Sequence, residues 1–190
     1  MMKIYKLISN IKEFSFFLYD HKGNSNRELS ISRDSITWKW NYPSKYNIAT
    51  FELRAGDNKK KNYNFDISTF ESPFIIISEK AWLDLKDILE PRGVLLEINT
   101  QSKRKKFYGY YPTNSITIKS LNKELSTFTE YPNGIIVRDL VLNEKYLSDD
   151  YLFSIENTSL ILVTEKFKER VEKAGLLGFD FSEENNVVVS

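Results

Sequence analysis

The 190-residue chain contains no cysteine, which excludes disulfides, thiolate metal sites and a cysteine nucleophile and fits a reducing compartment. Its one histidine, His21, cannot build a cluster of histidine metal ligands, and any Ser/His/Asp triad would have to use it. None of the seven glycines belongs to a phosphate-binding motif. The adjacent acids Asp149-Asp150 and Glu183-Glu184 remain, but such pairs are usually solvated. We therefore expect no catalytic residue, no metal site and no cofactor.

Long apolar runs are missing as well. No stretch approaches the length of a membrane span, and Lys3, Lys6 and Lys12 interrupt the N-terminus too often for a signal peptide. A net charge of +1 argues against a dedicated nucleic-acid binder. Apolar residues make up 41% of the chain, which is ample for a core. These features predict a soluble, cytoplasmic protein with no membrane partner.

Two segments, 74–98 and 160–181, share one order of features. Each opens with an apolar run that suits a strand covered on both faces, followed by Ser78 or Thr164 at a helix N-cap position. An amphipathic helix pattern and a returning apolar strand come next, with Gly175 expected at positive φ after the second helix. Either a duplication or the ordinary look of such units explains the match. We predict an α+β fold with more strand than helix, helices at 79–90 and 165–174, and two similar strand–helix–strand units.

The first 70 residues are expected to form a β-rich N-terminal part, and residues 71–190 an α+β part, with one continuous domain as the alternative. Strands are predicted at 2–8, 14–19 and 48–54, and Leu29 and Ile31 alternate in the same way. Ile36, Trp38 and Trp40 recur with period 2 and predict a further strand. No helix is expected before residue 78.

Two aromatic stretches offer alternative functions. The basic run 103–106 leads into the aromatic run 107–112, so residues 103–111 could form a nucleic-acid-binding module. A hairpin loop with solvated charges explains this stretch equally simply, and nucleic acid is an improbable partner at this net charge. Trp38, Trp40 and Tyr42 are the basis of a second alternative, a carbohydrate-active or carbohydrate-binding protein, although strand packing accounts for their spacing.

The order of parts over residues 65–182 resembles a family of bacterial immunity proteins from polymorphic toxin systems, first catalogued as a domain of unknown function. The motifs that carry the resemblance are Ser78-Glu79-Lys80, the Tyr110-Tyr111-Pro112 strand, Thr164-Glu165-Lys166 and the closing stretch Gly175-Leu176-Leu177-Gly178-Phe179-Asp180-Phe181. Members of the family close on a similar Gly-Leu-x-Gly-x-x-Phe pattern. The resemblance implies a non-enzymatic protein that binds and neutralises a cognate toxin domain, and it supplies no functional residues.

Charge is unevenly distributed along the chain. Up to residue 120 there are 20 basic and 13 acidic residues, and from residue 121 there are 7 basic and 13 acidic residues. Ordinary surface variation is one interpretation. The other is an acidic face that binds a basic toxin, because complementary charge speeds and orients encounters. The candidate toxin-binding residues on this interpretation are Glu130, Glu144, Asp149, Asp150 and Glu156.

Overall fold

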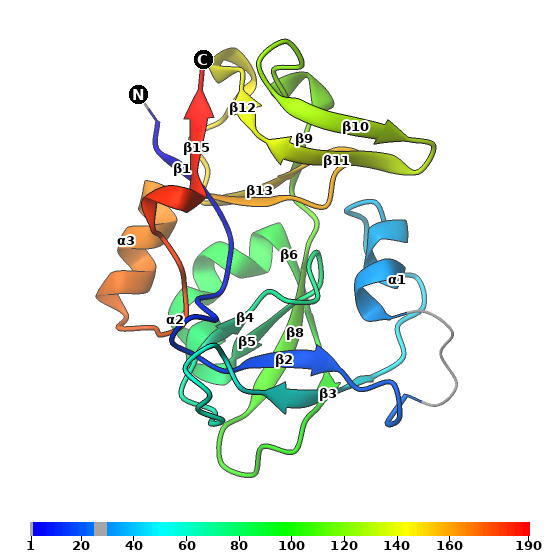
Figure 1. Ribbon diagram of the computed structural model, residues 1–190, viewed down its shortest axis with the longest axis vertical. Coiled ribbons are helices and arrows are strands. Elements are labelled where there is room, and N and C mark those ends of the chain that lie inside the picture. The colour runs from blue at the N-terminus through cyan, green and yellow to red at the C-terminus, as the bar shows by residue number, and fades with distance from the viewer. Residues whose placement is uncertain (1, 25–29) are drawn as a thin grey trace.

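The computed structural model describes residues 2–24 and 30–190, and within them strand exceeds helix, which confirms the predicted strand-rich α+β class (Figure 1). The α-helices are α1 (Ile31–Thr37), α2 (Glu79–Leu89) and α3 (Glu165–Lys173). Short 3-10 turns follow at η1 (Glu90–Arg92), η2 (Ile118–Ser120), η3 (Glu144–Tyr146) and η4 (Glu183–Asn185). The strands are β1 (Ile4–Lys6), β2 (Phe16–Tyr19), β3 (Ala49–Arg54), β4 (Ile67–Ser68), β5 (Ile75–Ser78), β6 (Gly93–Leu96), β7 (Ile98–Asn99), β8 (Phe107–Pro112), β9 (Ser115–Ile116), β10 (Thr127–Tyr131), β11 (Gly134–Asp139), β12 (Val141–Leu142), β13 (Leu152–Ile155), β14 (Ile161–Thr164) and β15 (Asn186–Val189).

The described strands form four sheets. A six-stranded sheet has the order β12-β15-β1-β14-β13-β9, and both chain ends lie beside it at the top of Figure 1. A four-stranded sheet, β4-β5-β8-β6, occupies the middle, a three-stranded sheet, β2-β3-β7, lies below it, and β10-β11 is a separate hairpin. β1 lies between β14 and β15, and β4 pairs with β5. Strands from either side of residue 70 therefore share sheets.

β5 separates two hydrophobic clusters, which explains its unbroken apolar sequence. Ile75 and Ile77 face the cluster beneath α2 and α3, whereas Phe74 and Ile76 face the cluster under β2 and β3. Successive side chains of a strand point to opposite faces, so a strand covered on both sides needs apolar residues throughout. A third cluster, around Phe153, lies on the six-stranded sheet. The prediction of a strand buried on both faces is confirmed here.

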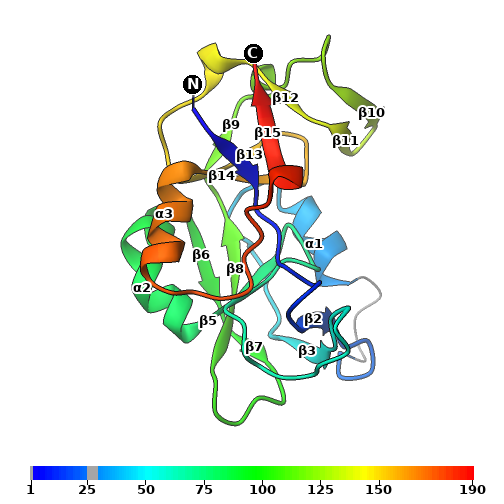
Figure 2. The ribbon, with the colours of Figure 1, turned by 60° about the vertical axis from the view of Figure 1, so that its left-hand side comes forward.

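Both predicted helices are present, and they pack side by side in Figures 1 and 2. Ser78 caps α2, because its hydroxyl accepts a hydrogen bond from the backbone N–H of Ala81 at 3.0 Å. Thr164 occupies the equivalent position before α3 but makes no such bond; its Oγ1 donates to the carbonyl of Asp150 instead. Gly175 adopts φ +60° after α3, as predicted. The two units therefore start alike and differ in how the helix is capped.

The prediction of a returning strand after α3 is wrong. β6 does return beside β8 after α2, but residues 176–181 contain only an isolated bridge between Phe179 and Ser9. Gly178 has φ +90°, and a Cβ there would lie 3.1 Å from that of Phe65. This turn redirects the chain, so that Leu177 bonds to the backbone of Asp66 before the segment continues along residues 8–10. The expected similarity of the two units therefore does not extend to their ends.

The strand predicted from Ile36, Trp38 and Trp40 is also wrong, as is the expectation of no helix before residue 78. Residues 31–37 form α1, whose buried residues Ile31 and Ser35 are spaced as on one helical face. The apolar residues at every second position do not indicate a strand here. Lys39 and Trp40 follow the helix at positive φ, and this backbone turn carries the Trp40 ring back into the core. Leu29, expected to alternate with Ile31, lies outside the described residues.

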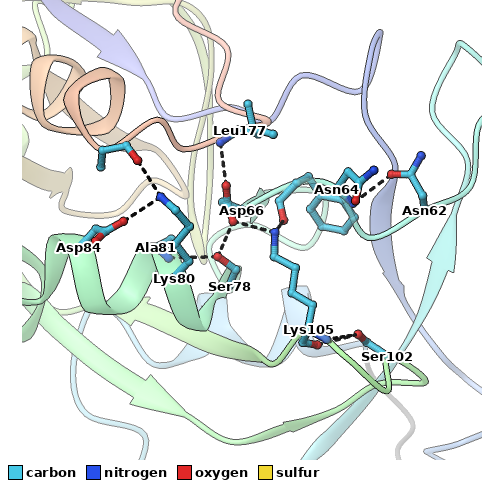
Figure 3. A network of polar contacts seen from close by, with 12 residues as sticks. Asn62, Asn64, Asp66, Ser78, Lys80, Ala81, Asp84, Ser102, Lys105 and Leu177 are labelled. Atoms are coloured by element: carbon cyan, nitrogen blue, oxygen red, sulfur yellow. Dashed lines mark hydrogen bonds and ion pairs between the residues drawn. The ribbon is translucent and has the colours of Figure 1, made fainter.

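Asp66 joins four segments in the centre of the molecule (Figure 3). Its carboxylate is 2% exposed and accepts bonds from the Ser78 hydroxyl at 2.6 Å, the Lys105 ammonium at 2.8 Å and the Leu177 backbone N–H at 2.8 Å. Its own backbone N–H donates to the Leu177 carbonyl. Burial alone would raise the pKa of Asp66, but the bonds from Lys105, Ser78 and Leu177 outweigh burial and lower it.

Replacing Asp66 by Asn should lower the free energy of unfolding by about 3 kcal/mol, because an amide nitrogen would face one of these buried donors. The matched control is Asp149→Asn, whose carboxylate pairs with Lys166 on the surface and should change stability by no more than about 0.5 kcal/mol. Urea denaturation of both variants measures the difference. Equal stability of Asp66→Asn and parent would contradict the role assigned to Asp66.

The lowered pKa of Asp66 also predicts a pH dependence. A carboxyl whose pKa is lower in the folded state stabilises the fold above its unfolded pKa of about 4, and that stability is lost as pH falls through the folded pKa. The stability gap between parent and Asp66→Asn should therefore narrow below about pH 4. A gap that stays constant down to pH 2 would contradict this assignment.

Candidate functional site

A cleft separates α1 from the tip of the β10–β11 hairpin and from the turn that follows β13. One hollow of about 540 Å³ lies over Trp40 and Tyr111, and a second of about 800 Å³ lies between α1 and the hairpin. We call the two hollows together the α1–hairpin cleft, since they share the lining residues Ile36, Lys39, Tyr131, Asn133, Gly134, Ile135 and Asn157. Figure 1 shows α1 directly below the hairpin.

The floor of the cleft is held rigidly by buried aromatic residues. The Trp40 and Tyr111 rings stack with centroids 5.7 Å apart, and the Trp40 backbone N–H donates to the Tyr111 hydroxyl at 2.8 Å. The Trp40 indole N–H donates to the Ile155 carbonyl at 3.1 Å, which ties α1 to β13. Burial raises the pKa of Tyr111 to about 12, so its hydroxyl stays protonated at neutral pH. The floor is therefore apolar and uncharged.

The hairpin wall is positioned by both packing and one backbone bond. Phe128, Ile135 and Val137 pack against the cluster around Phe153. The Ile135 backbone N–H donates to the Asn157 carbonyl at 2.6 Å, which joins the hairpin to the turn after β13. A short loop closes the hairpin, because Tyr131 pairs with Gly134 across it. The hairpin tip is therefore held at a set distance from α1.

Three large apolar side chains remain exposed around the cleft. Ile36 is 45% exposed, Tyr131 55% and Ile136 60%, and all three line the cleft. We call them the apolar rim. Single exposed apolar residues are normal, but several gathered around one hollow are typical of a surface that binds a protein or a ligand. The rim comes from α1 and both ends of the hairpin loop, which are separated by about a hundred residues of sequence.

Backbone strain is concentrated at the same place. Among the described residues, four non-glycine residues have positive φ, and three of them line the cleft: Lys39 at +48°, Trp40 at +59° and Asn157 at +60°. Such a conformation costs about 1–2 kcal/mol for a residue with a side chain. Observed strain of this kind clusters at binding and active sites. The coincidence with the apolar rim makes this cleft the strongest candidate site.

The cleft carries charges of both signs, and only some of them have a partner of opposite charge. Lys123, from the loop before β10, pairs with Glu130 at 2.6 Å, and the Glu156 carboxylate accepts a bond from the Ile118 backbone N–H at 3.1 Å. Arg33 on α1 and Lys39 just after it are both exposed, and neither has a carboxylate partner within the part of the chain that the structure describes. The uncompensated charge on this wall of the cleft is therefore positive.

The five acidic residues chosen from the sequence do not form one face. Glu130 and Glu156 lie at the cleft, whereas Glu144 lies near the C-terminus, where its backbone N–H donates to the Ser190 carbonyl. Asp149 pairs with Lys166 of α3. Asp150 is largely buried, and its carboxylate binds Arg92 and the Asn114 amide. Asp150 therefore stabilises the fold locally, and its charge is compensated.

Neither of the two alternative surfaces presents a row of exposed aromatic rings. Phe107, Tyr110 and Tyr111, which follow the basic run, are at most 3% exposed, and the Lys105 ammonium is held by Asp66. Only Tyr108 stays partly exposed, with the Lys106 ammonium 4.7 Å from its ring centroid. Trp40 is buried in the cleft floor and Trp38 packs edge-on against Tyr111, whereas Tyr42 is 75% exposed. Bases or sugars would find no row of rings to stack on at these places.

Other candidate chemistry is sparse. His21 is exposed and contacts the edge of Tyr19, with ring centroids 5.0 Å apart. No group of three or more His, Asp or Glu side chains within residues 2–24 and 30–190 is arranged to hold a metal ion. None of the described helices has the length and apolar character needed to cross a bilayer.

No family model and no curated protein matches the chain. The resemblance of residues 65–182 to immunity proteins is therefore carried by the quoted motifs alone. The structure places Ser78 and Gly175 of these motifs at helix ends and Gly178 at a turn. These are structural positions, so the motifs indicate a fold and leave the binding surface to be found from the geometry.

The strain at Lys39 predicts an unusual substitution effect. Lys39→Gly should raise the free energy of unfolding by about 0.5 to 1 kcal/mol, because glycine adopts positive φ without a steric cost. Lys45→Gly is the control, since Lys45 is exposed in the same loop at negative φ and should lose up to about 1 kcal/mol. Urea denaturation measures both variants. Destabilisation of the two variants to the same extent would contradict strain at Lys39.

Proposed function

We propose that this protein is a non-enzymatic immunity protein that binds a cognate bacterial toxin domain in the cytoplasm and blocks its activity. The resemblance of residues 65–182 supports the toxin class. The observation that carries partner binding is the apolar rim, Ile36, Tyr131 and Ile136, around a cleft built on strained backbone. An exposed apolar rim with a rigid floor provides affinity without any group that performs chemistry.

The energetics of neutralisation favour anchors of this kind. A lethal partner must dissociate slowly, which demands nanomolar affinity or better, about −12 kcal/mol. Buried area alone does not guarantee such affinity, and a few well-packed anchors usually supply most of it. The cleft supplies a stacked aromatic floor, Trp40 and Tyr111, beneath exposed apolar walls. Because the floor is already formed, less conformational entropy is lost on binding.

Co-expression with a candidate toxin domain encoded by a neighbouring gene tests the proposal. The parent protein should restore growth, and the two proteins should elute together in size-exclusion chromatography. Toxicity that persists at full expression of the folded protein, with no complex formed, would overturn the proposed function.

Replacing His21 by Ala tests the non-enzymatic part. Because His21 is exposed and makes one ring contact, its loss should change the free energy of unfolding by no more than about 0.5 kcal/mol and leave growth rescue intact. Thermal denaturation and the growth assay measure the two effects. A His21→Ala protein that stays folded and binds the toxin, yet fails to protect the cell, would show that catalysis is involved.

A further inference from the structure

The polar groups around the cleft indicate what kind of segment it receives. Arg33 and Ile36 of α1 and Lys39, two residues beyond its end, all line the second hollow, so two cations stand beside an apolar side chain there. Neither cation has a carboxylate partner among the described residues. Of the acids at the cleft, Glu130 pairs with Lys123, and Glu156, away from α1, accepts a bond from the Ile118 backbone N–H. The α1 wall therefore complements negative charge next to an apolar side chain.

The cleft also offers polar groups that suit a peptide backbone. The side chains of Asn133 and Asn157 are exposed at the cleft and make no hydrogen bond to any described residue. An amide side chain both donates and accepts, so it can bind the N–H and C=O of an extended segment. Since the two hollows share seven lining residues, the cleft is continuous and longer than one side chain. A cleft of this volume with amide groups along it can accommodate an extended segment of several residues.

We propose that the α1–hairpin cleft binds an extended, acidic segment of the partner protein. A large apolar side chain of that segment packs over Trp40 and against Ile36 and Ile136, and its carboxylates pair with Arg33 and Lys39. This inference rests on the proposed function, since the partner is the toxin domain. The partner segment is therefore acidic, whereas the acid-rich last third of the chain predicts a basic partner.

Charge reversal on α1 is the direct test. The variant Arg33→Glu/Lys39→Glu is compared with Lys103→Glu/Arg104→Glu, which changes the formal charge equally. Lys103 and Arg104 are exposed in the loop between β7 and β8, at the opposite end of the molecule from the hairpin in Figure 1. Neither pair takes part in a described ion pair, so both variants should keep the parent melting temperature within a few degrees.

The probe is a fluorescent peptide of about twelve residues in which glutamate alternates with leucine and phenylalanine, and fluorescence anisotropy reports its binding. Parent and Lys103→Glu/Arg104→Glu should bind it, and Arg33→Glu/Lys39→Glu should bind about tenfold more weakly or less, with the difference shrinking as salt increases. A peptide with lysine in place of glutamate and an oligothymidylate are the comparison ligands. No saturable binding of the acidic peptide by the parent, preference for either comparison ligand, or equal losses in the two variants overturns the inference.

The apolar contribution is tested separately. Ile36→Ser/Ile136→Ser removes two rim side chains, and Leu83→Ser on α2 removes a side chain that is 66% exposed and lies outside the cleft. The rim variant should weaken the acidic peptide about tenfold or more, whereas Leu83→Ser should leave it unchanged. Weakening to the same extent by Leu83→Ser would show that non-specific apolar contact is responsible and would overturn the inference.

The toxin domain then separates the two proposals. If the parent rescues growth and Arg33→Glu/Lys39→Glu rescues poorly, both stand. If parent and variant rescue equally and bind the toxin with equal affinity, the cleft inference fails while the proposed function stands. If the parent does not rescue but binds the acidic peptide through Arg33 and Lys39, the proposed function fails and the peptide-binding cleft stands.

Discussion

The middle of the molecule depends on the buried carboxylate of Asp66. It joins β4, the cap of α2, the loop before β8 and the segment after α3 through three hydrogen bonds that all favour the ionised form. Ser78 takes part twice, because its hydroxyl donates to Asp66 and accepts from the first turn of α2. Breaking such a network leaves several buried donors without acceptors, which costs more than the loss of any single bond.

The candidate site lies on the far side of this framework and depends on it indirectly. β8 crosses the four-stranded sheet next to β5 and delivers Tyr111 to the cleft floor, where Trp40 stacks on it. The six-stranded sheet contributes β13 and the turn at Asn157, to which the hairpin is bonded. The walls therefore come from three separate parts of the fold. The strain at Trp40 and Asn157 is tolerated because bonds to Tyr111, Ile155 and Ile135 hold these residues in place.

The features predictable from the sequence are those with a local cause. The apolar run of β5, the Ser78 cap and the positive φ of Gly175 each depend on a few adjacent residues. α1 was missed because Lys39 and Trp40 adopt positive φ without being glycine, which turns helical spacing into apparent alternation. The Asp66 network and the α1–hairpin cleft could not be predicted, since the residues that form them are distant in sequence. The five acids failed for the opposite reason: they are concentrated in the last third of the sequence, yet the fold does not place them on one face.

A toxin domain bound as we propose would cover the α1–hairpin cleft. Hydrogen–deuterium exchange of the protein with and without the toxin domain tests it directly, because bound backbone amides exchange more slowly. We expect added protection in residues 31–40, 128–137 and 156–159, and unchanged exchange in residues 100–106 and 144–150. Protection confined to 144–150, to 100–106 or to any surface that leaves the cleft unchanged would contradict the account.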